Sequence, residues 1–181
     1  MRIIGGTHRG RLLKRVMKET TRETADMVKE AVFNMLGGHC FGVVLDLYAG
    51  SGAYGLEAIS RGASKAIFVD QERQAIQTVQ INAKSLGMEM HIETYVTEDI
   101  KFIQMWKKER FDLIFLDPPY QHAVYEDVLL KLHPWINPDA YVVCESDRKR
   151  ILPDTLGSLI KIKDKTYGIK RITIYQNERA K

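Results

Sequence analysis

The sequence predicts an α/β fold: a doubly wound, Rossmann-like, mostly parallel seven-stranded sheet with a C-terminal antiparallel hairpin, preceded by a basic N-terminal extension. Three observations support this. From Val43 onward, apolar runs typical of buried strands alternate with segments of helical periodicity. A glycine-rich turn follows the first of these runs. The stretch SLIKIKDKTYGIKRITIYQ contains two β-rich runs joined near TYGIK, which indicates the antiparallel hairpin.

The elements follow in order. RIIGGTHRGRLLKRV has two short extended runs around THRG and predicts a flexible hairpin. TADMVKEAVFNMLGG has apolar residues at helical spacing, with Thr24 as a suitable N-cap and Gly37-Gly38 as a stop. Parallel strands are then expected at 43–50, 65–70, 90–96, 111–117 and 140–146, and helices at 52–62, 72–87, 98–110 and 122–135.

Length and composition favour one domain in a soluble, cytoplasmic, monomeric protein. The chain has 181 residues and no apolar stretch near the ~18 residues that span a bilayer, so no membrane contact is expected. Cys40 and Cys144 lie in apolar surroundings and are expected to be reduced core thiols. The five histidines show no ligand spacing, so no metal is expected.

The charge is uneven. Residues 1–22 hold seven lysines and arginines against Glu19 alone, a net charge of +6, whereas the other 159 residues sum to −2. We therefore divide the chain into a basic arm, residues 1–22, and a body, residues 23–181. Such an arm suits a polyanionic partner, although a merely solubilising terminus explains the charge equally well. The run Arg148-Lys149-Arg150 is interpreted as a solvated turn that could also contact phosphate.

The first strand-to-helix turn, GSGAYG, fits the pattern G-x-G-x-x-G. Asp70 closes the next strand, 20 residues after Gly50. In that context the motif predicts a site for a nucleotide-like cofactor, with Asp70 accepting hydrogen bonds from both ribose hydroxyls. Gly50, Ser51 and Gly52 let the backbone approach the ligand.

The motif alone fits both NAD and S-adenosylmethionine, and three further features favour S-adenosylmethionine. Asp46, four residues before Gly50, suits a methionine amino group and would repel a pyrophosphate. Asp99 is placed to accept from an adenine amine, although an acid that complements the dipole of a helix N-terminus is an equal explanation. The third feature is the sequence FLDPPY, which ends the fourth strand where a doubly wound sheet opens its crevice.

FLDPPY suits methyl transfer to the exocyclic amine of a base. Such an amine is a poor nucleophile, and acceptors around its N–H groups stabilise the charge that develops on nitrogen. The side chain of Asp117 and the carbonyl of Pro118 are suitable acceptors, and Pro118-Pro119 stiffen the turn. Tyr120 offers a flat face for an extruded base.

With both motifs in place, the chain resembles the class I S-adenosylmethionine-dependent methyltransferases. Five segments follow in order over nearly the whole chain: RIIGGTHRGRLL, TRETADMVKEAVFNML, DLYAGSGAYGLEAISRGA, FLDPPY and YGIKRITIYQ. Together they resemble the bacterial RsmD-type family, which modifies a guanine exocyclic amine (N2) in small-subunit (16S) ribosomal RNA. One segment departs, because the family usually has Arg-Pro-Thr-Thr-Asp-Arg where this chain has Arg22-Glu23-Thr24-Ala25-Asp26-Met27.

The resemblance implies a role for each matching position. The expected cofactor residues are Asp46, Gly50, Ser51, Gly52, Asp70 and Asp99, the expected target-amine residues are Asp117, Pro118, Pro119 and Tyr120, and the expected RNA contacts are Arg2, Arg9, Arg11, Lys14, Arg15 and Arg22.

Three other functions stay open on the sequence. A DNA adenine or cytosine amino-methyltransferase would use the same clamp, but usually needs a further recognition region. An NAD-dependent oxidoreductase would leave Asp46 and the proline pair unexplained. A non-enzymatic RNA-binding module would not need Asp70 together with the glycine loop.

Overall fold

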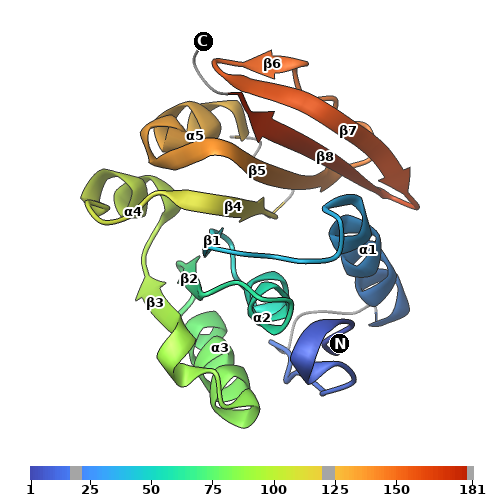
Figure 1. The fold of residues 1–181 in the computed structure, drawn as a ribbon, viewed down its shortest axis with the longest axis vertical. Coiled ribbons are helices and arrows are strands. Elements are labelled where there is room, and N and C mark those ends of the chain that lie inside the picture. The colour runs from blue at the N-terminus through green and yellow to red at the C-terminus, as the bar shows by residue number, and fades with distance from the viewer. Residues whose placement is uncertain (17–21, 120–124, 179–181) are drawn as a thin grey trace.

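A computed structural model shows one eight-stranded sheet with helices on both faces (Figure 1). It describes residues 1–16, 22–119 and 125–178, and for residues 22–25 the backbone alone. Tyr120 and the side chain of Arg22 therefore lie outside the described residues.

The strand order is β3-β2-β1-β4-β5-β8-β7-β6. Strands β1 to β5 pair in parallel, and β8, β7 and β6 add to the β5 edge in antiparallel pairs. The strands are β1 (Val43–Asp46), β2 (Lys65–Asp70), β3 (Ile92–Val96), β4 (Phe111–Leu116), β5 (Ile136–Asp147), β6 (Thr155–Leu156), β7 (Leu159–Tyr167) and β8 (Lys170–Asn177). The helices are α1 (Arg22–Met35), α2 (Ala53–Ser60), α3 (Arg73–Leu86), α4 (Asp99–Met105) and α5 (Tyr125–Leu132), with 3-10 turns η1 (Gly6–His8), η2 (Glu89–His91) and η3 (His133–Trp135).

The predicted fold class is confirmed: a mostly parallel α/β sheet with antiparallel C-terminal strands. The sheet has eight strands rather than the predicted seven, because the short β6 pairs with the start of β7. Strand β5 also begins earlier than the predicted residue 140. Its first residues include Pro138 and Asp139. The backbone of Asp139 has a φ of +66°, and the pairing register between β4 and β5 shifts in this region.

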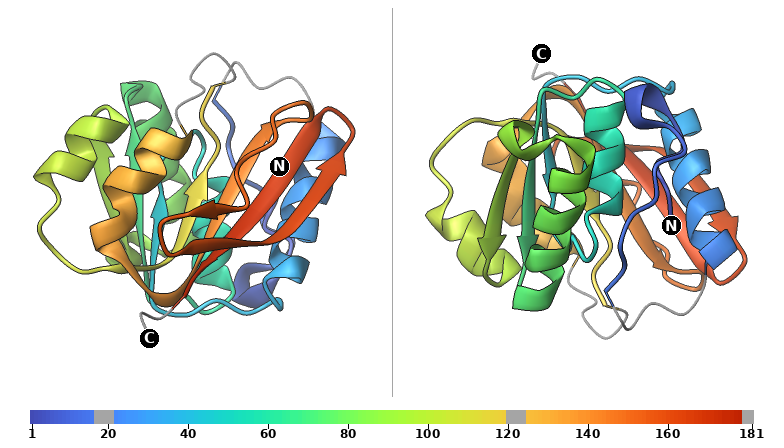
Figure 2. Two further views of the ribbon diagram at one scale, coloured as in Figure 1. Left: turned by 90° about the horizontal axis from the view of Figure 1, so that it is seen from above. Right: turned by 90° about the horizontal axis from the view of Figure 1, so that it is seen from below.

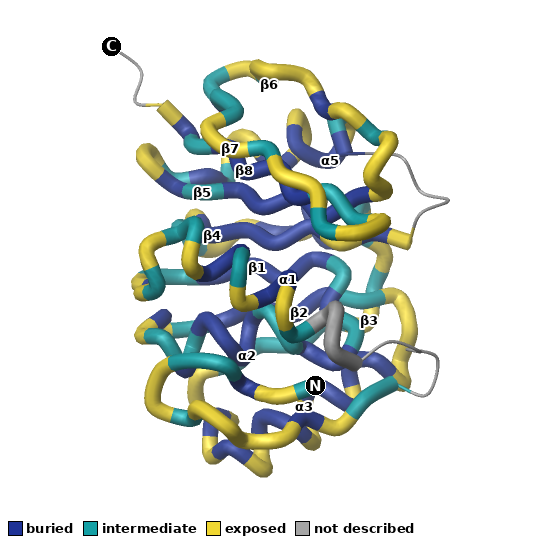
Figure 3. The backbone as a smooth tube through the Cα atoms, turned by 90° about the vertical axis from the view of Figure 1, so that its right-hand side faces the viewer, coloured by how far each residue is buried: buried dark blue, intermediate teal, exposed yellow. Residues whose placement is uncertain are grey.

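Two apolar layers sandwich the sheet. Successive strand residues point to opposite faces, so Val44 and Phe115 pack with α1, α2 and α3, whereas Leu45 and Leu116 pack with α4 and α5. In both views of Figure 2, α1 lies on one side of the strands and α4 on the other. Figure 3 shows the central strands mostly buried and β6 largely exposed. This double cover explains why the parallel strands are continuously apolar.

The N-terminal residues form a hairpin, as predicted, but the structure shows it packed on the body and not as the flexible hairpin that was expected. Arg2 and Leu12 form an antiparallel bridge, and Ile3 and Leu13 are buried in the layer that contains α1 and α2. Gly6 has a φ of +76°, and a Cβ there would lie 1.8 Å from the carbonyl oxygen of Ser60 in α2. Only glycine allows this close approach, which gives the Gly5-Gly6 pair a packing role.

Both cysteines are free and buried, as expected. Burial raises the pKa of the Cys40 thiol to about 11. Among the described residues, no helix has the length and apolar character needed to cross a membrane.

Candidate active site

A cleft of about 840 Å³ opens at the carboxyl ends of β1, β2 and β4. This is the edge at which open α/β sheets bind ligands. Val16, from the end of the N-terminal hairpin, and Lys170, from the start of β8, complete the wall. Six of the predicted site residues line this cleft together: Gly50, Asp70, Asp99, Asp117, Pro118 and Pro119.

The Asp70 carboxylate is held by two backbone donors. Its Oδ2 accepts from the Gly50 N–H at 2.9 Å, and its Oδ1 accepts from the Glu72 N–H at 2.9 Å. Both oxygens are thereby oriented at the cleft wall, and each keeps a second lone pair with which it could accept from a ligand hydroxyl. Gly52, with a φ of +80°, forms the N-cap of α2 in the left-handed region that glycine tolerates.

Asp46, Ser51 and Gly52 lie behind the cleft wall instead of on it. Asp46 is buried, and its Oδ2 accepts from the Gly55 N–H at 3.0 Å, which ties β1 to the start of α2. Burial raises the pKa of this carboxyl to about 7, although the Gly55 bond acts in the opposite direction. In the glycine loop, Gly50 therefore faces the cleft, Ser51 and Gly52 lie behind it, and Asp46 holds the loop to the start of α2.

Asn82 of α3 links the glycine loop to the N-terminal hairpin. Its amide nitrogen donates to the carbonyl oxygens of Ser51 and Lys14, each at 2.9 Å, and its Oδ1 accepts from the Lys14 N–H at 2.7 Å. The predicted basic arm is thus fastened to the turn expected to bind the cofactor. This contact could not be predicted from the sequence, because it joins residues far apart in the chain.

Asp99 at the start of α4 has a partner that the sequence reading missed. The Tyr48 hydroxyl donates to Asp99 Oδ2 at 2.5 Å, and the Ile100 N–H donates to Oδ1 at 2.6 Å. Burial, followed by the bond to Asp99, raises the pKa of Tyr48 well above its usual value. Tyr48 also lines the cleft, so a tyrosine and a carboxylate together border the expected adenine position.

At the other end of the cleft, Asp117 and Pro119 are exposed and Pro118 is buried. Behind them, Tyr54 stacks on Phe115 with ring centroids 4.7 Å apart. Burial, together with the nearby carboxylates of Glu145 and Asp117, raises the pKa of Tyr54 far above its usual value. The stacked Tyr54 ring therefore lies close enough to the Asp117 carboxylate to feel its charge.

Glu145, near the end of β5, is a second residue that the sequence reading missed. Its carboxylate is buried, accepts from the Tyr54 hydroxyl at 2.8 Å and forms an ion pair with Lys170. Lys170 thus lines the cleft in a position fixed by a buried anion. The only sequence signal was an acid at the end of the apolar run YVVCES.

The predicted RNA contacts are spread over the outside of the N-terminal hairpin. Arg9, Arg11 and Lys14 are exposed, and the Arg11 guanidinium donates to the Ser85 carbonyl at 2.9 Å. Arg2 lies 3.8 Å from the Asp26 carboxylate, and one terminal nitrogen of Arg15 is buried without a hydrogen-bond partner. Among the described residues, no three histidine, cysteine or acidic side chains form a group that could hold a metal.

The donor and acceptor set of the cleft fits a cation better than a pyrophosphate. Acidic side chains from three segments line it. Among the described residues that line the cleft, Lys170 is the one basic side chain. The acids are Asp70, Glu72, Glu98, Asp99 and Asp117. S-adenosylmethionine carries a sulfonium and an amino group, whereas two phosphates would meet like charge. The fold and this cleft are those of a class I methyltransferase, the class of enzymes that uses S-adenosylmethionine.

Comparison with known proteins gives the family. A family model described as "Conserved hypothetical protein 95" matches residues 1–176, and the chain belongs to this family. YlbH of Bacillus subtilis is 40% identical, over 97% of this chain and 98% of its own. The protein named Ribosomal RNA small subunit methyltransferase D from Haemophilus influenzae is 34% identical, over 98% of this chain and 94% of its own. These relatives confirm the resemblance to the RsmD type.

Solved structures agree. That of yhhF from Escherichia coli superposes with a TM-score of 0.87 at 30% sequence identity and covers 99% of both chains. A Streptococcus pyogenes structure is 37% identical with a TM-score of 0.79, and the match covers 83% of this chain and 95% of that one.

Proposed function

We propose that this protein transfers a methyl group from S-adenosylmethionine to the exocyclic N2 amine of a guanine in small-subunit ribosomal RNA. The observation that carries the proposal is that one cleft contains both Asp70 with the glycine loop and the Asp117-Pro118-Pro119 turn. The relatives' names support ribosomal RNA as the substrate. The exposed basic residues of the N-terminal hairpin suit an RNA partner.

Each part of the cleft has a defined task in this proposal. Asp70 would accept from the ribose hydroxyls, and Tyr48 with Asp99 would border the adenine. When bound, S-adenosylmethionine supplies a methyl group on a positively charged sulfur, the leaving group of the reaction. The acidic lining of the cleft would favour that positive charge in the ground state.

Asp117 and the Pro118 carbonyl would accept hydrogen bonds from the amine N–H groups and hold the nitrogen lone pair in line with the methyl carbon. The methyl group would pass from sulfur to this nitrogen, and the electron pair of the broken C–S bond would stay on sulfur. The methylated nitrogen then loses one proton, either to Asp117 or to water. The stacked rings of Tyr54 and Phe115, next to the strand end that carries Asp117, would limit movement of this turn.

Transfer of a radiolabelled methyl group tests the proposal. The acceptors are unmodified small ribosomal subunits, naked small-subunit RNA and duplex DNA. We expect label in the RNA as N2-methylguanine, and a loss of roughly 100-fold or more in rate for Asp117→Ala. Asp154→Ala, at a side chain that is 93% exposed and outside the cleft, is the matched control and should keep the wild-type rate. Label in DNA alone would reject the RNA substrate and favour a DNA amino-methyltransferase.

A further inference from the structure

The C-terminal strands carry a concentration of positive charge that the N-terminal arm does not account for. Residues 147–171 hold eight lysines and arginines against three aspartates, a net charge of +5. Residues 23–146, which supply most of the cleft, hold ten basic against eighteen acidic residues, a net charge of −8. An acidic body repels a nucleic acid, so RNA could approach this cleft only along basic flanks.

The strand register places this charge beside the cleft. Asp147 at the end of β5 pairs with Lys170 at the start of β8, and Lys170 also pairs with Tyr167 at the end of β7. Because β5 runs parallel to β4, the exit of β5 and the β7–β8 turn lie at the same edge as Asp117. Lys170 itself lines the cleft.

Backbone and side-chain bonds join the two turns into one surface. The Arg148 N–H donates to the Ile169 carbonyl at 2.8 Å, and the Arg171 guanidinium donates to the Arg148 carbonyl at 3.2 Å. Arg171 is anchored by two bonds to Asp164, and Arg150 by two bonds to Glu126. These internal ion pairs hold the side chains of Arg171 and Arg150 in place beside the two turns.

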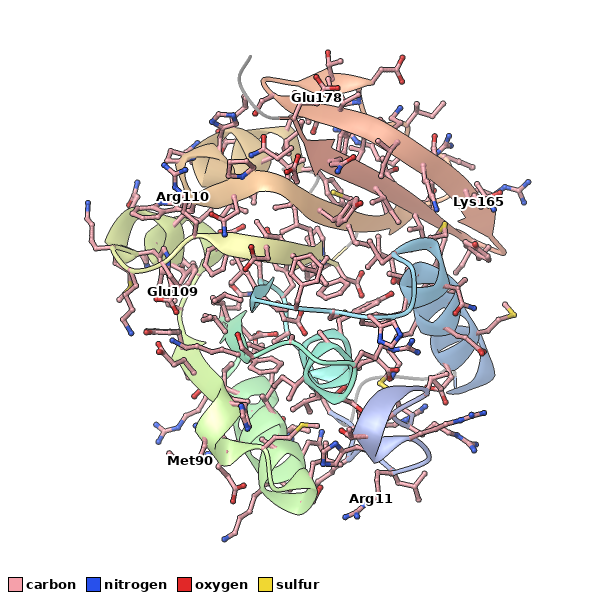
Figure 4. The ribbon with its side chains drawn as sticks, in the orientation of Figure 1. Arg11, Met90, Glu109, Arg110, Lys165 and Glu178 are labelled. Carbon is pink, nitrogen blue, oxygen red and sulfur yellow. The ribbon has the colours of Figure 1, made fainter. Side chains whose placement is uncertain are left out.

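Three other cations of this surface point to solvent. Arg148, Lys149 and Lys165 are exposed, and within the described part of the chain their side chains form no ion pair or hydrogen bond. Figure 4 shows Lys165 projecting outward beside the tip of the β7–β8 hairpin. Ile169, 69% exposed, lies at the β7–β8 turn, where its carbonyl accepts from the Arg148 N–H. We name Arg148, Lys149, Lys165 and Ile169 the hairpin rim.

We infer that the hairpin rim binds the phosphate backbone of the RNA strand that enters the cleft, on the side away from the N-terminal hairpin. The inference rests on the proposed function, because it takes RNA as the substrate. Exposed cations at fixed positions suit phosphates, and an exposed aliphatic side chain among them suits contact with a base or sugar. The rim and the N-terminal hairpin would then hold the RNA on both sides of the acidic cleft.

The test compares two triple variants with the same change of charge. Arg148→Gln/Lys149→Gln/Lys165→Gln neutralises the rim. Lys84→Gln/Lys107→Gln/Arg110→Gln removes three exposed cations elsewhere, and Arg110 precedes β4 at the opposite edge of the sheet (Figure 4). The measurements are steady-state methylation of small-subunit RNA and RNA binding as a function of salt. Cofactor affinity and thermal unfolding are followed in parallel.

For the rim variant we expect about a tenfold or larger rise in KM for RNA, with kcat and cofactor affinity within about twofold of wild type. The slope of log K against log salt should fall by about 2, at ~0.7 for each lost phosphate contact on a single strand. The control variant should stay within about twofold of wild type in KM. Equal KM and equal slopes for the two variants, with wild type active on RNA, would overturn the inference alone. Wild type that transfers nothing to RNA would overturn the proposed function, and the inference with it.

Discussion

At the scale of single residues, the buried Asp46 carboxylate shows that the glycine loop is built around a group that is costly to ionise. Asp46 has its pKa raised from 3.8 to about 7, first by burial and also by the nearby Asp70 carboxylate. The protonated form is therefore favoured in the folded protein. Between pH 4 and 7 the folded state binds more protons than the unfolded chain, so this group makes stability fall as pH rises.

We expect Asp46→Asn to remove that pH dependence, because an amide keeps an acceptor for the Gly55 N–H but does not ionise. The melting temperature of the variant relative to wild type should rise from pH 4.5 to pH 8, with most of the change below about pH 7. Thermal unfolding across this range measures it. Asp127→Asn, on the exposed face of α5, is the control. A difference in melting temperature between Asp46→Asn and wild type that stays constant from pH 4.5 to pH 8 would contradict the expectation.

The sequence predicted the residues that line the cleft at the strand ends better than the residues that hold them in place. Gly50, Asp70, Asp99 and the Asp117 turn follow strand ends, and parallel strands bring those ends to one edge, so their meeting in the cleft was predictable. Their roles stay predictions. The Tyr54–Glu145–Lys170 group was not predictable, because it joins α2, β5 and β8 through the antiparallel register of the last strands.

At the scale of elements, one buried ion cluster fastens the N-terminal hairpin to α1 and α2. The Glu57 carboxylate is fully buried and accepts from the N–H groups of Ile4 and Gly5 and from the Arg61 guanidinium, each at 2.8 Å. Lys29 lies 3.1 Å from Glu57 and donates to the Arg2 carbonyl at 2.6 Å. Burial lowers the pKa of Lys29, while Glu57 acts in the opposite direction.

Glu57→Gln should destabilise the protein by about 3–5 kcal/mol, because it leaves the Lys29 ammonium buried without its anion. Urea unfolding measures the change. Lys29→Met/Glu57→Gln should recover part of the loss, since the buried Lys29 ammonium is then also gone and only the Arg61 guanidinium is left without its anion. Lys101→Ala, which breaks an exposed pair with Glu98, should cost at most about 1 kcal/mol. A loss for Glu57→Gln no larger than that control would show that the cluster is weakly coupled to folding.

The elements themselves were predicted well where periodicity is long, and less well at their ends. The helix predicted at 98–110 ends at Met105, because Trp106 turns into the apolar layer, with its indole N–H bonded to the Glu109 carbonyl at 2.9 Å. The start of strand β5 was predicted too late, because Asn137-Pro138-Asp139 resembles a loop in sequence. Ile136 already pairs with Phe111 of β4, and regular pairing with β4 and β8 is in place from Tyr141 onward, so the three residues form an irregular stretch inside the strand.

At the scale of the whole molecule, the N-terminal hairpin belongs to the folded body as well as to its charged surface. Ile3 is fully buried and Leu13 nearly so. Ile3→Ala should cost about 2–5 kcal/mol in urea unfolding, as for other buried aliphatic truncations. Leu12→Ala, at a side chain that is 74% exposed, should cost far less. A similar small cost for both would mean that the hairpin is not coupled to the global unfolding transition.

Removing the whole arm would therefore confuse loss of folding with loss of RNA contact, and substitution of exposed charges separates the two. Arg9→Gln/Arg11→Gln keeps the backbone bonds of the hairpin and changes two exposed side chains. We expect RNA affinity to fall and its salt slope to decrease by about 1–2, because two phosphate contacts are lost, while cofactor affinity and urea unfolding stay at wild-type values. Lys84→Gln/Lys107→Gln, with the same loss of charge on other elements, should leave RNA affinity within about twofold. If both double variants lose RNA affinity equally, net charge alone explains the effect. If only the hairpin variant does, the hairpin contacts RNA directly and brings it to a cleft whose wall it also completes through Val16.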